Sequence, residues 1–182
     1  MRADAARNLE AVLSASARLL GADPGARITD IADAAGVDRR TIYRRFQSRE
    51  ELLHAIYRAR LDALAAVIDA ARLEEAPVLV ALHALAEGGI RLSREWPVDI
   101  RAAVESDVVI RREEINDRMG AFLERGQREG LIDSGLPEGL PLAMLHAVLR
   151  TLALELPDLS SARAADLAVD SFLNGLGAGR TR

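Results

Sequence analysis

The residues of this 182-residue chain best suited to chemistry lie at 39–45, where four arginines accompany Thr41 and Tyr43. A guanidinium group presents a planar fork of N–H donors that fits phosphate oxygens and the O6 and N7 acceptors of guanine. The hydroxyl groups of threonine and tyrosine can add hydrogen bonds to a phosphate. All 24 basic residues are arginine, as a GC-rich coding bias would also produce, so the number of arginines alone identifies no partner. Their position is the informative feature.

Charge is spread unevenly along the chain. Residues 1–60 hold 11 arginines and eight acidic residues, a net charge of +3, while the remainder carries −7, which gives the overall −4. A basic segment joined to an acidic body is expected when one end of a protein meets a polyanion and the other does not. The modest net charge and the 49% share of hydrophobic residues exclude a highly charged chromatin tail and argue against disorder.

Two short helices joined by a tight turn are predicted around the arginines. Thr29 is expected to cap the first helix, and Gly36, in the left-handed conformation, to end it. Asp38 can cap the second helix at once, so the turn is short and the two helices must cross at a steep angle. On the second helix Ile42 and Phe46 are four residues apart and face inward, which leaves the arginines outside. The pattern is a helix-turn-helix whose second helix exposes the N-terminal end that reads bases in the major groove.

In the rest of the chain, apolar residues also recur at the spacing of a helix, and no segment alternates apolar and polar residues as a strand does. Ser48 and Glu51 form a capping box for a long helix that keeps its apolar spacing to about Arg72. The predicted fold class is all-α, with an N-terminal three-helix helix-turn-helix domain and about nine helices in total. The tail from Gly177 is expected to fray. The expected segments are 9–20, 30–35, 38–46, 48–72, a helix from Pro77 that loosens at Gly88-Gly89 and ends before Trp96, 98–107, a longer segment with Ile115 to Leu123, 142–156 and 165–176.

The helix-turn-helix segment closely resembles the tetracycline-repressor-type (TetR) family of bacterial regulators, over roughly the first third of the chain. Arg49 stands where the family usually has lysine, and it preserves a cation there. The loop with Asp23-Pro24 also departs from the family pattern, away from the recognition face. The likeness is carried by the apolar first helix and by Ile31-Ala32, Ala35-Gly36-Val37, Thr41-Ile42-Tyr43, Phe46, Arg49 and Glu51-Leu52-Leu53.

The resemblance implies two domains and roles for individual residues. Residues 1–50 would form the helix-turn-helix DNA-binding domain, and residues 51–182 a helical domain that binds an effector and dimerises. The sequence leaves open which arginine reads a base and which contacts a phosphate. Phosphate contacts are implied for Thr29, Tyr43 and Arg49, and proximity to the bases for Arg39, Thr41 and Arg45, with Arg40 and Arg44 able to serve either role.

Candidates for a ligand pocket lie in the second domain, and each has a structural alternative. Met119 and Phe122 have the spacing of core residues, and Trp96 can plug a helix end. His83 and Glu87, four residues apart, could share a metal ion, but no further ligands lie nearby, so neither a metal nor a cofactor is predicted. The candidate pocket residues are His83, Glu87, Trp96, Met119 and Phe122.

The last two helices carry more apolar surface than the core of one chain needs, so a partner chain is expected to cover the excess. In the family they would pair with their twins as a four-helix bundle. The candidate interface residues are Leu145, Leu149, Leu152, Val169, Phe172 and Leu173.

Several classes of protein are disfavoured. The chain has no cysteine, so thiol chemistry and disulfides are excluded. It contains no nucleophile elbow, H-E-x-x-H pair or phosphate-binding loop, and we therefore expect no enzyme. Its apolar runs are shorter than the ~20 residues that span a bilayer, and its N-terminus lacks a signal peptide, so a cytoplasmic protein without a membrane partner is expected.

Two functions fit these patterns. The first is a homodimeric transcriptional regulator, usually a repressor, that binds a palindromic double-stranded DNA operator and is released by a small-molecule effector. The alternative is a helical ligand-binding or protein-binding module that does not bind DNA. The sequence identifies neither the effector, the operator nor the regulated genes, and it does not separate a repressor from an activator.

Overall fold

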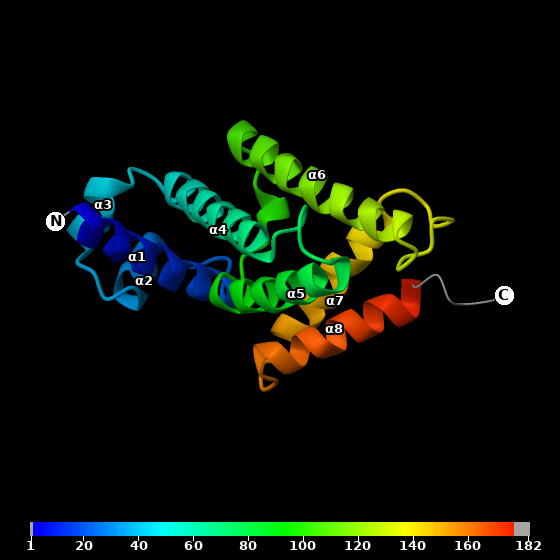
Figure 1. Cartoon of the computed structure of the whole chain (residues 1–182). Helices are drawn as coiled ribbons and strands as arrows, with labels where there is room; N and C mark the ends of the chain where they lie inside the picture. The colour runs from blue at the N-terminus through cyan, green and yellow to red at the C-terminus, as the bar shows by residue number, and fades with distance from the viewer. Residues whose placement is uncertain (1, 177–182) are drawn as a thin grey trace. The chain divides into compact units, whose positions relative to one another are not determined.

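The computed structural model describes the backbone of residues 2–176 and the side chains of residues 9–175. Over that range the chain is helical and has no strand, which confirms the predicted all-α class (Figure 1). The tail from Gly177 lies outside the described residues. The elements are α1 (Arg2–Ala22), α2 (Ile28–Ala34), α3 (Arg39–Arg45), α4 (Arg49–Ala71), α5 (Val78–Glu95), the 3-10 helix η1 (Ile100–Ala102), α6 (Ser106–Arg128), α7 (Leu140–Leu154) and α8 (Ser161–Leu176).

The predicted segment 98–107 is wrong as a helix, because only the single 3-10 turn η1 forms there. The Asp99 side chain accepts a hydrogen bond from the backbone N–H of Arg101 and caps this turn. The backbone then becomes extended at Ala103, with ψ of 134°. Three of the seven residues from Val98 to Val104 are β-branched and resist helix formation, so α6 starts afresh at Ser106.

The chain forms two compact units. The first unit contains residues up to 63 together with 95–110, and the second contains residues 64–94 and those from 111 onward. Helix α4 contributes residues to both units, as do α5 and α6. Each unit is described by itself below.

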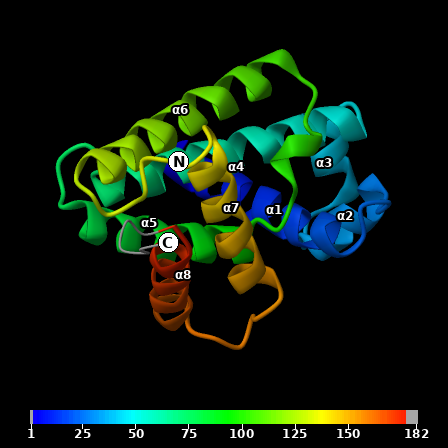
Figure 2. The ribbon, with the colours of Figure 1, turned by 90° about the vertical axis from the view of Figure 1, so that its right-hand side faces the viewer.

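The first unit is built around α1, α2 and α3, which lie together in Figure 2. Its core contains apolar side chains that are almost inaccessible to solvent, and each leucine, isoleucine or phenylalanine among them contributes about 1.5–3 kcal/mol on burial. The N-terminal half of α4 adds Leu52 and Ile56, both fully buried. The other core residues of this unit include Leu13, Ala17, Leu20, Ile31, Ala32, Ile42 and Phe46.

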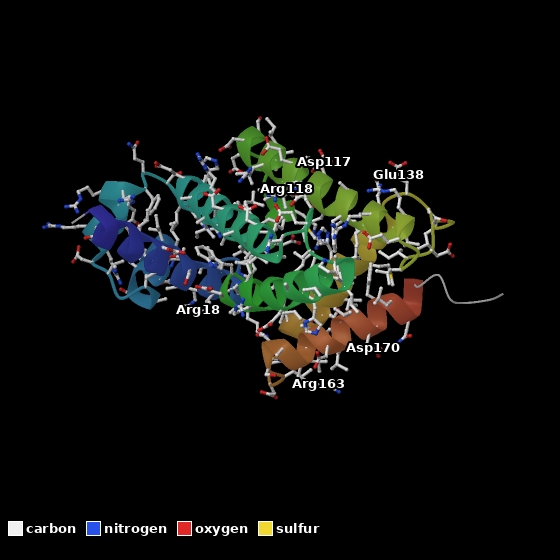
Figure 3. The ribbon with its side chains drawn as sticks, in the orientation of Figure 1. Arg18, Asp117, Arg118, Glu138, Arg163 and Asp170 are labelled. Atoms are coloured by element: carbon white, nitrogen blue, oxygen red, sulfur yellow. The ribbon has the colours of Figure 1, made fainter. Side chains whose placement is uncertain are left out.

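In the second unit, α5 packs closely on the end of α4. A Cβ atom added at Gly88 would lie 2.5 Å from Cγ1 of Val67, so only glycine permits this approach. Helix α5 runs without a break through Gly88 and Gly89, and the predicted loosening there is wrong. Gly88 marks tight packing instead, whereas a Cβ atom at Gly89 would lie 3.4 Å from Cδ1 of Leu149, an ordinary contact. Arg118 of α6, labelled in Figure 3, bonds to Asp69 of α4 at 2.9 Å from Nη2 to Oδ1.

Helices α7 and α8 are neighbours within the second unit, as Figures 1 and 2 both show. Ala164, Ala165 and Ala168 of α8 are fully buried. Arg94 at the end of α5 donates to main-chain carbonyl groups of the α7–α8 connection, including Leu159 at 2.8 Å. None of the helices in the described part of the chain is both long and apolar enough to cross a bilayer.

Candidate nucleic-acid interface

The turn between α2 and α3 has the predicted chemistry. Gly36 adopts a φ of +66°, in the left-handed region, which confirms that it ends α2. Asp38 caps α3, because its Oδ1 accepts from the backbone N–H of Arg40 at 2.8 Å. Both features confirm the predicted helix-turn-helix.

The start of α2 differs from the prediction. The helix begins at Ile28, with Arg27 at the N-cap position, so Thr29 lies inside the first turn and does not cap it. The Asp30 carboxylate accepts from the backbone N–H of Arg27 at 3.0 Å, and this bond holds the pKa of Asp30 below its usual value. Asp30, three residues after the N-cap residue, thus makes the capping bond at the start of α2 in place of Thr29. The Thr29 hydroxyl is directed to Asp30 at 3.4 Å.

Helix α3 has one buried side and one exposed side. Ile42 is 2% exposed and Phe46 is 6% exposed, as expected for the inward pair. The Tyr43 side chain is 50% exposed, which is high for so large an aromatic group. The six residues of α3 that the sequence assigned to DNA binding are all exposed: Arg39, Arg40, Thr41, Tyr43, Arg44 and Arg45.

One of the four arginines of α3 has a carboxylate partner. Arg39 Nη2 lies 2.9 Å from Oδ2 of Asp33 on α2, and this bond raises the pKa of the Arg39 guanidinium. Within the described residues, Arg40, Arg44 and Arg45 form no ion pair. Sequence reasoning missed Asp33, because residues six apart across a turn follow no helical spacing.

Arg49 ties the start of α4 to the loop that follows α1. Its Nε donates to the carbonyl oxygen of Ala26 at 3.3 Å, and its Nη2 donates to that of Pro24. The predicted cap of α4 is present, since Ser48 Oγ accepts from the backbone N–H of Glu51 at 3.1 Å. Arg49 is half-buried, unlike the arginines of α3. The phosphate contacts assigned to Thr29 and Arg49 stay predictions.

The segment after α5 is joined to α4 within the first unit by polar contacts. Arg60 Nε donates to the carbonyl oxygen of Trp96 at 3.0 Å, and the Trp96 side chain is 1% exposed. Burial lowers the pKa of the Arg60 guanidinium, although Asp99 acts in the opposite direction. Arg60 Nη1 is buried and has no hydrogen-bond partner among the residues that the structure describes. Trp96 thus serves as a core residue of this unit, and its pocket role stays a prediction.

The other four predicted pocket residues lie in the second unit and fall into two groups. His83 Nε2 contacts Asp166 Oδ1 at 2.8 Å, and Glu87 pairs with Arg91 at 3.3 Å, all with side chains at least 39% exposed. Met119 and Phe122 are buried, at 2% and 3% exposure. The guanidinium of Arg125 lies 5.6 Å from the centroid of the Phe122 ring. No group of three potential metal ligands occurs in the described part of the chain.

The predicted interface residues pack inside their own chain. Five of them are buried there, and Leu173 is half-buried. Helical periodicity selects the most apolar stripe of a helix, and in α7 and α8 that stripe forms the core of the chain itself. The role of these helices in dimerisation stays a prediction. The five buried residues are Leu145, Leu149, Leu152, Val169 and Phe172.

Comparisons with known proteins point to one family. The sequence pattern described as "Bacterial regulatory proteins, tetR family" matches residues 12–56, which run from α1 into α4. The HTH-type transcriptional repressor LfrR of Mycolicibacterium smegmatis is 37% identical over 86 residues, which are 47% of this chain and 46% of the relative. The match thus spans about half the length of this curated relative.

Solved structures share the fold over nearly the whole chain. The TetR-like transcriptional regulator LfrR from Mycobacterium smegmatis, in complex with proflavine, matches with a TM-score of 0.74 and 23% identity, over 93% of this chain and 97% of that one. The TetR family transcriptional regulator PfmR from Thermus thermophilus matches with a TM-score of 0.72 and 22% identity, over 93% and 99%. At these identities the likeness establishes the fold.

Proposed function

We propose that this chain is a transcriptional regulator of the tetracycline-repressor-type (TetR) family, which acts as a homodimer and is released from a palindromic DNA operator by a small molecule. The observation that carries this proposal is the exposed side of α3. Four arginines, Thr41 and Tyr43 stand free of the core on a capped helix whose N-terminal end is the end that enters a major groove.

A palindromic operator has two matching half-sites, so binding to both of them requires a symmetric dimer. Two recognition helices of a symmetric dimer meet successive major grooves about 34–36 Å apart, and the operator then has matching half-sites. Helices α7 and α8 are the proposed dimerisation element, as a four-helix bundle with their twins.

The proposed effector is a small molecule held by the second unit, with Met119 and Phe122 as the apolar candidates for contact. A TetR-like relative was solved with proflavine, which supports a small organic effector for this chain as well. Helix α4 is one continuous helix with residues in both units, so a tilt of its second half would displace its first half. Reversing an occupancy of 99:1 requires about 5.5 kcal/mol of differential affinity of the effector for the two states.

The salt dependence of duplex binding, with Tyr43→Ala as the variant, tests the proposal. The logarithm of the binding constant should fall steeply with the logarithm of salt concentration, by about 0.9 per phosphate neutralised. Tyr43→Ala should weaken duplex binding and leave effector binding intact, because Tyr43 is exposed and outside the core. No measurable affinity for any duplex at low salt would favour the alternative of a helical binding module. An unchanged affinity in Tyr43→Ala would remove Tyr43 from the interface.

A further inference from the structure

The Arg39–Asp33 pair sets one arginine of α3 apart from the other three. Arg39 Nη2 and Asp33 Oδ2 are 2.9 Å apart, on side chains that are 59% and 62% exposed. Arg40, Arg44 and Arg45 are also exposed, and none of them has a carboxylate partner within the described residues. The helix thus presents three uncompensated cations and one cation whose charge is balanced by a neighbour.

A DNA phosphate distinguishes these two kinds of arginine. It attracts an uncompensated guanidinium, and neutralising it releases condensed counterions. It repels a carboxylate that lies a few ångströms from the guanidinium, so the Arg39–Asp33 pair gains little from a phosphate. Arg40, Arg44 and Arg45 are therefore better suited to the DNA backbone than Arg39 is.

For contact with a base edge, the orientation of an arginine matters more than its uncompensated charge. Guanine presents two neutral acceptors, O6 and N7, and recognition depends on the orientation of the guanidinium fork more than on its net charge. The bond to Asp33 uses one of the five N–H donors of Arg39 and restricts its rotamers. Arg39 is also the first residue of α3, at the end of a recognition helix that contacts base edges.

We propose that Asp33 is a positioning residue that orients Arg39 to read a guanine in each half-site, while Arg40, Arg44 and Arg45 bind phosphates. For Arg45 this assignment replaces the proximity to the bases that the family resemblance implies. This assignment rests on the proposed function. It adds Asp33 to the residues that determine specificity, and it divides the arginines between bases and backbone.

The test uses the full-length protein and the duplex that it selects from random sequence. Affinities are measured for that duplex and for a panel in which each base pair is replaced in turn. A bidentate arginine discriminates against a wrong base by roughly 5- to 150-fold. In Asp33→Asn, discrimination at one guanine per half-site should fall by roughly two- to fivefold, the scale of an exposed ion pair, with the discrimination at the other positions unchanged.

Two arginine variants test independently which arginine reads a base and which binds a phosphate. Arg39→Lys keeps the charge and loses the fork, so it should lose the preference at the same guanine and keep the salt slope. Arg44→Ala should keep every base preference and reduce the salt slope by about 0.9 for each phosphate that the variant no longer neutralises. Glu50→Gln is the control for carboxylate removal, because Glu50 is an exposed acid at the start of α4, and it should leave the base preferences unchanged.

The outcomes separate this assignment from the proposed function. The assignment would be overturned if Asp33→Asn changed the affinity for all duplexes equally and left discrimination at every base pair unchanged. An unchanged base preference in Arg39→Lys would also overturn it. Either result would leave the proposed function as a DNA-binding regulator standing. A wild-type protein that selects no duplex would overturn both.

Discussion

His54 of α4 binds Asp107 of α6, with Nε2 2.9 Å from Oδ1 and 3.1 Å from Oδ2. Arg58, one turn further along α4, lies 3.5 Å from Oδ2 of the same carboxylate. The bond from His54 is the main reason why the pKa of Asp107 lies below its usual value. Within the first unit, this contact joins the helix that follows the recognition helix to the first turn of α6.

Acid should selectively remove the contribution of Asp107 to stability. Its folded-state pKa is depressed, so the ionised carboxylate stabilises the fold above the ordinary value of 3.8, and this stability is lost as pH falls from there through the folded pKa. Urea unfolding should therefore show that wild type is more stable than Asp107→Asn at pH 7, and that the gap closes below that value.

Asp117→Asn is the control for this titration, because Asp117 is an exposed residue of the same helix (Figure 3). It should change stability little at any pH. A gap between wild type and Asp107→Asn that persists at pH 2 would show that the carboxylate charge is not what stabilises the contact.

Gly88→Ala should destabilise the second unit. Its new methyl group would lie 2.5 Å from Cγ1 of Val67, and relieving such an overlap in a packed core costs about 1–3 kcal/mol. The free energy of unfolding in urea, followed by circular dichroism, measures the loss.

Gly120→Ala is the matched control, since Gly120 also lies within a helix of the second unit but has open space at its Cβ position. This variant should gain about 0.5–1 kcal/mol, because alanine is the better helix former. Equal effects of the two substitutions would mean that α5 and α4 do not pack closely at Gly88.

Arg60 should respond differently to two truncations. Arg60→Met retains an apolar stem and removes a charge whose buried Nη1 has no partner in the described part of the chain, so the free energy of unfolding should change by no more than about 1 kcal/mol. Arg60→Ala removes the packing as well, and should cost about 1–3 kcal/mol. Fluorescence of Trp96, the single tryptophan, reports unfolding at this contact. A loss in Arg60→Met as large as that in Arg60→Ala would show that the bond to the Trp96 carbonyl dominates.

Local sequence rules were sufficient for most of the helices and for the recognition turn. Gly36, Asp38 and Ser48 act on backbone groups within three residues, so their roles can be read from the chain itself. The inward positions of Ile42 and Phe46 follow from the four-residue spacing of a helix face. The prediction for Thr29 failed because α2 begins one residue before it, at Ile28, and the local capping bond comes from Asp30 instead.

Local sequence rules could not predict contacts between residues that are far apart in the chain. His54 and Asp107 are 53 residues apart, and no periodicity relates them. The glycines of α5 suggested a weak helix, whereas the side chain that requires one of them, Val67, is on another helix. The apolar stripes of α7 and α8 marked buried surface correctly, but a stripe does not say whether its own chain or a partner covers it.

Selection of bound sequences from random duplex DNA shows whether the exposed side of α3 reads a double helix, on which the proposed function depends. We expect enrichment of a palindrome whose half-site centres are about one helical turn apart, and loss of that enrichment in Tyr43→Ala. Recovery of no preferred sequence at low salt, or of a motif that Tyr43→Ala selects equally well, would contradict this role of α3.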